Sequence, residues 1–336
     1  MLSSKTVFIV GAGASQEVGM PVGGDLRDII AKKLHMWFEG HEFTGKGDIK
    51  IVDRLRFKYG NDMGSYIDTC TLINRGIGLS ASIDDFIDIH RDNPRVAVCG
   101  KLAIASSILE KERQSKLYVD PSNIYNTINV GSIQDTWYVA FLRLVQVPKG
   151  DLARLFENVT IICFNYDRCI EQFLVHAITS QYGIKKEEAQ TLVAKLRMFR
   201  PYGSVGDNFG GVPFGSSSLP SLESVVSSLR TYTEQIEDEA TLQAMKGAVL
   251  SAKTLVFLGS AFHANNMALL RPPENTHNEP KQIFATRKGI SDADLVRVKY
   301  AFSVLRGVPS EHHDTGNFFA STCSDLFETY KLSLRR

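Results

Sequence analysis

Residues 6–15 read Thr6-Val-Phe-Ile-Val10-Gly11-Ala-Gly13-Ala-Ser15, and this stretch decides the fold class. The first five residues are β-branched, aliphatic or aromatic, which indicates a buried strand. The glycines that follow indicate a tight turn, because glycine adopts backbone conformations that other residues avoid. A strand that ends in Gly-Ala-Gly suggests a backbone that approaches a phosphate closely, with a helix dipole behind it.

Three further apolar runs predict strands at residues 159–164, 254–258 and 282–285. Their hydrophobicity is continuous rather than alternating, which is typical of strands that are buried on both faces. Such strands occur in mainly parallel sheets that helices cover on each side. We therefore expect an α/β fold with a mainly parallel sheet.

Residues 49–156 show mostly helical periodicity and no convincing strand. This pattern predicts a helical insert module within the sheet domain. We therefore divide the chain into three segments. Residues 1–48 form the first part of the sheet domain, residues 49–156 form the insert, and residues 157–336 form the remainder of the sheet domain with C-terminal helices.

Several helices can be placed from their caps and periodicity. Ser82-Ile-Asp-Asp85 fits a capping box that opens a helix. Residues 96–113 and 133–145 are two more amphipathic candidates. Ahead of the insert, we expect Asp25 to serve as the N-cap of a helix over residues 26–34.

Composition narrows the class of protein. The 336 residues include 38 basic and 37 acidic side chains, and the formal net charge is +1. This balance argues against a strongly basic surface, so we expect no direct nucleic-acid binding. No window approaches about 18 uncharged apolar residues, so we expect no membrane span. The 5 cysteines are scattered without a CxxC pair, which predicts neither disulfides nor a zinc ribbon and favours a reducing, cytoplasmic location.

The glycine turn, taken alone, leaves two interpretations open. It is either a nucleotide-binding turn or a plain tight turn between a strand and a helix. The usual dinucleotide fingerprint needs a third glycine where this chain has Gln16, so an ordinary dehydrogenase is disfavoured. The chain also lacks the glycine-rich Walker sequence, which excludes a P-loop phosphotransferase.

Small or polar residues follow three of the predicted strands directly. These segments are Gly11–Ser15, Asn165–Asp167 and Gly259–Asn266. In open α/β sheets, ligands bind outside the carboxyl ends of the strands. Three such strand ends in one chain therefore favour a ligand site at that edge of the sheet.

The same segments resemble the motifs of a known family. Gly11-Ala-Gly-Ala-Ser15 with Gly19-Met-Pro21 is similar to the GAGxS…GxP opening of the sirtuin superfamily, and in particular of its bacterial antiphage-defence branch. Phe164-Asn-Tyr-Asp167 with Glu171 resembles the (T/F)NYD…E motif of that branch. The resemblance covers most of residues 5–290 in the same order, and its other matches are Ser82-Ile-Asp-Asp-Phe86, Tyr202-Gly-Ser204, and Leu258-Gly-Ser-Ala-Phe-His263 with Asn266.

The resemblance implies a Rossmann-like domain that binds NAD as its substrate, with the insert closing one side of the site. It implies hydrolysis of NAD⁺ to nicotinamide and ADP-ribose by a homo-oligomer that a partner gates, such as an ATPase, a helicase or another defence-system protein. A true protein deacylase carries a four-cysteine zinc module that these cysteines cannot supply, so no metal is expected. The implied nucleotide contacts are Gly11, Ala12, Gly13, Ser15, Pro21, Asp167, Gly203, Ser204, Gly259, Ser260 and Asn266.

Asn165 is the first candidate for a catalytic residue. Departure of nicotinamide builds oxocarbenium character on the ribose, and a fixed amide dipole beside it is useful. The alternative is a turn residue, since Asn tolerates left-handed backbone and caps helices. Asp167 either caps the following helix or contacts the ligand, and Ser15 either binds a phosphate or caps the next helix.

The general base is harder to assign. Sirtuins use a His before the glycine that corresponds to Gly203, and this chain has Tyr202 there. Some branch members place a His two residues earlier, where this chain has Arg200. Tyr202 can donate a hydrogen bond or stack on nicotinamide, and Arg200 can pair with a phosphate. His263 is the candidate substitute, and its alternative is a loop or capping residue.

Three interpretations of the function therefore remain. The intact Phe164–Asp167 motif favours an NAD⁺ glycohydrolase with Asn165, Tyr202 and His263 as its catalytic residues. The missing His favours a non-catalytic module that binds NAD or ADP-ribose as a sensor. A zinc-free deacylase is a third and weaker alternative. The base contributes on the order of 10²- to 10⁴-fold to a rate, so its loss predicts slow turnover or binding alone.

Overall fold

The computed structural model describes residues 2–40, 42–206, 209, 211–231, 234, 239–272, 281–306 and 317–335. Six strands form one sheet in the order β5-β4-β1-β6-β7-β8, and every neighbouring pair is parallel. This confirms the expected α/β fold with a parallel, Rossmann-like sheet. The strands are β1 (Thr6–Val10), β4 (Val159–Cys163), β5 (Arg197–Phe199), β6 (Thr254–Leu258), β7 (Gln282–Thr286) and β8 (Asn317–Ala320).

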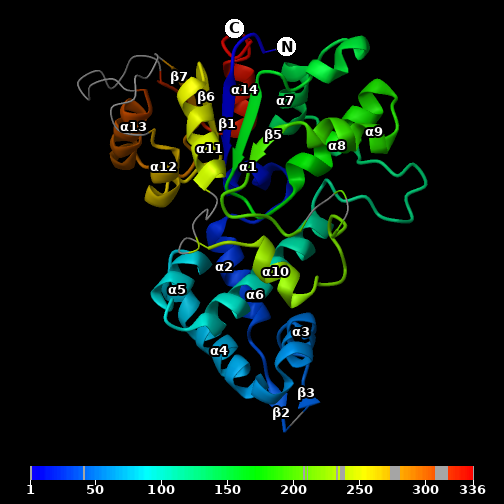
Figure 1. The fold of residues 1–336 in the computed structure, drawn as a ribbon, viewed down its shortest axis with the longest axis vertical. Helices are drawn as coiled ribbons and strands as arrows, with labels where there is room; N and C mark the ends of the chain where they lie inside the picture. Colours follow the sequence, from blue (N-terminus) through cyan, green and yellow to red (C-terminus); the bar gives the residue numbers. More distant parts are fainter. Residues whose placement is uncertain are drawn as a thin grey trace.

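Helices cover both faces of this sheet (Figure 1). On one face, Phe8 of β1 packs against Phe141 at 5.1 Å and Phe327 at 6.3 Å between ring centroids. On the other face, Phe257 of β6 packs against Phe302 at 4.9 Å. Successive strand residues therefore contact opposite helix layers, which explains the continuous hydrophobicity. The first layer holds α7 (Trp137–Val145), α8 (Cys169–Tyr182) and α14 (Cys323–Thr329), and the second holds α11 (Glu239–Ser251) and α13 (Asp292–Arg306).

A third group of helices lies beyond the carboxyl ends of the strands, in the lower half of Figure 1. Residues 49–156 are helices and turns without a strand, as the periodicity predicted. Two helices from outside that range join the group, however, and α7 from within it packs on the sheet. The division into three segments stays a prediction. The group consists of α2 (Gly23–Lys33), α3 (Ile49–Tyr59), α4 (Met63–Gly76), α5 (Ile83–Ile89), α6 (Pro94–Gln114) and α10 (Leu222–Ser228), with the hairpin β2 (Phe38–Glu39) and β3 (Glu42–Phe43) at its tip.

The remaining helices are short and connect these layers: α1 (Ala12–Ser15), α9 (Lys186–Ala194) and α12 (Ala264–Leu270). Among the helices in the described ranges, none has both the length and the apolar character that a membrane span requires. The expected role of Asp25 as N-cap is wrong. Helix α2 begins at Gly23 instead of residue 26, so Asp25 lies inside the helix, and its carboxylate accepts a hydrogen bond from the Val22 N–H at 3.4 Å.

Two other helix predictions can be compared with the structure. The helix start at Ser82 is confirmed, because the Ser82 hydroxyl accepts from the Asp85 N–H at 3.1 Å. The Asp85 carboxylate accepts from the Ser82 hydroxyl at 2.9 Å rather than from the Ser82 N–H, so the reciprocal half of a capping box is not formed. The helix expected over residues 133–145 begins only at Trp137. Residues 133–136 instead form a turn, in which the Thr136 N–H donates to the Ile133 carbonyl at 3.0 Å.

Candidate functional site

The carboxyl ends of β1 and β4 meet at the side chain of Asn165. Its Nδ2 donates to the Gly11 carbonyl and to the Ser15 hydroxyl oxygen, each at 3.1 Å. The hydroxyl of Tyr138, on α7, donates to the same Ser15 oxygen at 3.4 Å. Asn165 and Ser15 are both buried. The structure therefore joins three sequence-predicted residues, Gly11, Ser15 and Asn165, in one hydrogen-bonded unit.

These contacts fix the orientation of the Asn165 amide. The Gly11 carbonyl can only accept, so the NH₂ group of Asn165 must face it. The Asn165 Oδ1 then makes no hydrogen bond to any residue in the described part of the chain. That oxygen is left to accept a hydrogen bond from a ligand hydroxyl or a water molecule.

Ser15 does not cap the helical turn that follows it. It lies at the end of α1, and its side chain makes no capping hydrogen bond to the following turn. The capping interpretation is therefore wrong. The buried hydroxyl instead accepts from Asn165 and Tyr138, which holds the amide in place. The helix behind the glycine turn is also only one turn long, because α1 ends at Ser15.

The glycines that directly follow β1 and β6 pack against each other so closely that side chains at these positions would clash. The Gly13 N–H donates to the Gly259 carbonyl at 3.0 Å. A Cβ at Gly11 would lie 2.7 Å from the Gly259 carbonyl oxygen, and a Cβ at Gly13 would lie 2.9 Å from the Gly259 Cα. Gly259 itself has a φ of 58°, in the left-handed region. Close packing of two backbone turns therefore explains these glycines without any ligand.

Tyr202 and Asn266 connect the end of β5 to α12. The Tyr202 hydroxyl donates to the Asn266 Oδ1 at 2.6 Å, and the Tyr202 ring lies 5.7 Å from that of Phe164. The following Gly203 has a φ of 71°, and a Cβ there would lie 1.9 Å from the Ser228 carbonyl oxygen. The phenol is therefore held as a hydrogen-bond donor rather than poised as a base.

Asp167 and Arg200 both stabilise the β4–α8 turn. The Asp167 carboxylate accepts from the N–H of Cys169, the first residue of α8, at 3.1 Å, whereas Arg168 occupies the N-cap position. Arg200 forms a bidentate ion pair with Glu171, with both Nη2 contacts at 2.7 Å. Its Nη1 donates to the carbonyls of Asn165 at 2.9 Å and Asp167 at 3.0 Å. The guanidinium is thus engaged within the protein and braces the segment that carries Asn165.

The other predicted contacts lie around this centre. His263 is exposed at the start of α12, and its side chain forms no hydrogen bond or ion pair with any residue the structure describes. The Ser260 hydroxyl accepts from the Phe262 N–H at 3.1 Å, and the Ser204 hydroxyl donates to the Gly206 carbonyl at 3.1 Å. Ala12 is the first residue of α1 and Pro21 lies two residues before α2, and both are partly buried.

Sequence reasoning missed Asp84 as a neighbour of this site. The Tyr166 hydroxyl, next to Asn165, donates to the Asp84 Oδ1 at 2.7 Å. Burial raises the pKa of Asp84 to about 6. Both residues belong to motifs that resemble family motifs, Ser82–Phe86 and Phe164–Asp167, but their separation along the chain gave no sign that they touch.

Sequence reasoning also missed an ion pair inside the protein. Arg168, 1% exposed, binds Glu112 of α6, 0% exposed, with Nη2 to Oε2 at 2.6 Å and Nε to Oε1 at 3.1 Å. The Gly215 N–H donates to the same carboxylate at 2.9 Å, and Arg168 also donates to the Pro213 carbonyl at 3.1 Å. The pair therefore ties the β4–α8 turn to the helical group and to the loop at 211–215.

A cavity of about 600 Å³ lies beside this centre, on the α10 side of Gly203. Asn165 and the glycine turn do not line it. Across the described ranges, no group of three or more His, Cys, Asp or Glu side chains is placed to hold a metal ion. The cavity wall includes Arg168, Glu171, Arg200, Gly203, Ser204 and Arg230.

Comparison with known proteins adds no assignment, since no family model and no curated protein sequence matches this chain.

Proposed function

We propose that the chain is an NAD⁺ glycohydrolase that cleaves NAD⁺ to nicotinamide and ADP-ribose. The observation that carries this proposal is the fixed orientation of the Asn165 side-chain amide. Its amide is buried at the carboxyl end of β4, oriented by Gly11 and Ser15, and has an acceptor oxygen without a partner among the described residues. A preorganised dipole of this kind stabilises charge that develops in a transition state.

The chemistry requires little proton transfer before the glycosidic bond breaks. Nicotinamide leaves with the bonding electron pair as a neutral molecule, so no general acid is needed. Positive charge then develops at the ribose C1′, and a water molecule attacks that carbon and loses its proton to solvent. The Asn165 Oδ1 would accept a hydrogen bond from the ribose or from this water. Gly11 and Gly13 would lie beside the pyrophosphate, and Ser260 and Asn266 beside the adenosine ribose.

Turnover is expected to be slow, because no described residue is placed as a base at this centre. Tyr202 is held as a donor to Asn266, and Arg200 is paired with Glu171. Loss of a general base costs on the order of 10²- to 10⁴-fold in rate. Ser15 belongs in this proposal as a positioning residue for Asn165, because its hydroxyl oxygen already accepts two hydrogen bonds.

The second candidate is a sensor that binds NAD or ADP-ribose without hydrolysis. The engagement of both Tyr202 and Arg200 within the protein favours it. The antiphage-defence setting, the cytoplasmic location, a homo-oligomer and gating by an ATPase, a helicase or another partner rest only on the resemblance and composition, and they are proposed on that ground.

Two measurements on the purified full chain separate the candidates. Calorimetry reports binding of ADP-ribose, and chromatography reports nicotinamide released from saturating NAD⁺. Binding together with release above a heat-denatured control supports the glycohydrolase. Binding without release supports the sensor, and absence of both would overturn the nucleotide site.

A further inference from the structure

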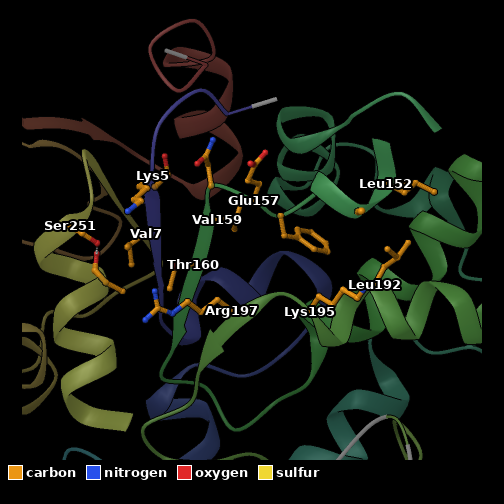
Figure 2. Close-up of a pocket in the computed structure, with 15 residues that line it drawn as sticks. Lys5, Val7, Leu152, Glu157, Val159, Thr160, Leu192, Lys195, Arg197 and Ser251 are labelled. Atoms are coloured by element: carbon orange, nitrogen blue, oxygen red, sulfur yellow. Dashed lines mark hydrogen bonds between the residues drawn. The ribbon is translucent and has the colours of Figure 1, made fainter. Parts of the chain in front are cut away.

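A second cavity lies at the opposite edge of the sheet, at the amino ends of β1, β4 and β5 (Figure 2). Its volume is about 290 Å³, close to the lower end of the roughly 300–1,000 Å³ typical of small-molecule sites. None of the residues assigned to the NAD site lines it. Its occupant would therefore differ from the ligand of the Asn165 centre.

The strand register builds one wall of this cavity. Val7 pairs with Thr160, and Thr160 pairs with Arg197, so these three residues form a row across β1, β4 and β5. Residues paired in register point to the same face of a parallel sheet. Ala248 and Ser251 of α11 line the cavity on one side, and an apolar wall on the other is formed by Leu152, Phe156 and Leu192.

The polar part of the lining is strongly cationic. Lys5, Lys195 and Arg197 come from three separate segments, and Figure 2 shows them around the cavity. The side chains of Lys5 and Lys195 form no hydrogen bond or ion pair with any residue in the described ranges, and both residues are exposed. Glu157 also lines the cavity, but it pairs with Arg154 at 2.9 Å outside it. The cavity therefore carries an excess of positive charge in a chain whose formal net charge is only +1.

The Arg197 guanidinium has N–H groups that are left to bind a ligand. Its Nη2 donates to the Ala244 carbonyl at 3.1 Å, and the other N–H groups make no hydrogen bond with any described residue. The Thr160 hydroxyl, its neighbour in the strand register, is also without a hydrogen-bond partner in the part of the chain that the structure describes. A guanidinium beside a hydroxyl recognises an oxyanion with charge-assisted hydrogen bonds.

We propose that this cavity binds a small amphipathic anion, with an aromatic or aliphatic body and one carboxylate, sulfonate or phosphate group. The anionic group binds Arg197 and Thr160, with Lys5 and Lys195 adding favourable charge. The body of the ligand packs against Leu152, Phe156 and Leu192. This site is independent of the proposed NAD chemistry.

The probe is 1-anilinonaphthalene-8-sulfonate, which has an aromatic body and one sulfonate, titrated into the full chain and followed by fluorescence. The parent is expected to bind one probe per chain with saturation. Arg197→Gln weakens that affinity by about tenfold or more, because charge-assisted hydrogen bonds are lost. Lys195→Gln weakens it by about two- to fivefold, because an exposed favourable charge is removed. Ser251→Phe weakens it by filling the cavity from an exposed position. Lys149→Gln is the matched control, since Lys149 is a neighbouring exposed cation outside the cavity, and it leaves the affinity unchanged.

Binding that does not saturate in the parent overturns the proposal, as does an unchanged affinity in Arg197→Gln. Circular dichroism checks that each variant folds. If Arg197→Gln does not fold, the exposed Lys195→Gln decides by the same criterion. Nicotinamide release is measured on the same variants. It is independent of probe binding, so failure of the anion site and failure of the NAD proposal are distinguishable.

Discussion

At the scale of single residues, the candidate site depends on the direction in which one amide points. The Gly11 carbonyl and the Ser15 hydroxyl both accept hydrogen bonds from the Asn165 Nδ2, and the Asn165 Oδ1 remains to accept a hydrogen bond from a ligand. An Asp at the same position would place a carboxylate oxygen against the Gly11 carbonyl, which is unfavourable. The choice of Asn over Asp is therefore set by the neighbouring strand end.

The positions of Asn165, Gly11 and Ser15 at strand ends could be predicted from the sequence, whereas the contributions of Tyr138 and Asp84 could not. Asn165 follows an apolar strand within a recognisable motif, and both signals are local. Tyr138 and Asp84 lie far from it along the chain and reach the site through tertiary packing. Arg200 and Tyr202 could be singled out from the sequence by their place just before Gly203. Only the structure shows that both are engaged by protein partners.

Asp84 should make stability depend on pH. Burial raises its pKa in the folded protein to about 6 from an ordinary 3.8. Above pH 6 the carboxylate is ionised and destabilises the fold, and as the pH falls from 6 toward 4 the folded state takes up a proton that the unfolded state does not. A shift of about 2 units corresponds to about 3 kcal/mol.

Asp84→Asn should therefore be more stable than the parent at pH 7.5, by about 1–3 kcal/mol. Its Oδ1 still accepts from Tyr166, and the advantage should shrink as the pH approaches 4. Urea unfolding at pH 7.5 and pH 4.5 measures both effects. Asp88→Asn, on an exposed position of the same helix, is the control. An Asp84→Asn advantage that is equal at the two pH values would contradict this account.

At the scale of elements, the site is a contact between two turns. The β1–α1 turn and the β6–α12 turn approach so closely that each occupies the space a Cβ of the other would need. Such contact is possible only because β1 and β6 are adjacent and in register. The glycines in these turns are needed for packing, and a nucleotide-binding turn would need glycines in the same places. The sequence motif alone therefore could not distinguish a nucleotide-binding turn from a plain tight turn.

Gly259→Ala should destabilise the protein by more than about 2 kcal/mol. Its Cβ would lie 1.9 Å from the Ala14 nitrogen, and the φ of 58° disfavours alanine. Gly247→Ala is the matched control, because Gly247 is exposed within α11 and a Cβ there has no atom within 4 Å. That change should stabilise by about 0.5–1 kcal/mol. Thermal melting compares them, and a neutral Gly259→Ala would refute the close packing.

The central strands could be predicted because each is a continuous run of apolar residues that can be recognised from the local sequence alone. β1 and β6 match the expected bounds, and β4 and β7 differ by one residue, since each is a continuous apolar run. β5 was missed because it has three residues at the sheet edge, which carry little pattern. The start of α2 was misplaced because Gly23 and Gly24 join the helix, although their intrinsic preference is against it.

At the scale of the whole molecule, the site lies where the sheet meets the helical group, in the middle of Figure 1. Buried polar contacts cross this boundary. Arg168 of the β4–α8 turn binds Glu112 of α6, and Tyr166 binds Asp84 of α5. Both crossing contacts arise within three residues of Asn165. The helical group thus supports the segment that carries the candidate catalytic amide.

Glu112→Gln should cost on the order of 3 kcal/mol of stability, because it leaves the Arg168 charge buried without its partner. The comparison is Glu157→Gln, which breaks an exposed pair with Arg154 and should cost less than about 1 kcal/mol. Chemical denaturation measures both. Equal losses in the two variants would show that the buried pair does not hold the helical group to the sheet.

The central claim is tested most directly by the rate of nicotinamide release from saturating NAD⁺, compared between the parent, Asn165→Ala and Asn74→Ala. Asn74 is a matched control, because its amide donates to the Ala31 carbonyl at 2.7 Å within the helical group. The account predicts release by the parent and by Asn74→Ala, and a rate at least about 100-fold lower in Asn165→Ala, which still melts in one cooperative transition at a temperature above that of the assay. Release by Asn165→Ala at the parent rate would contradict it.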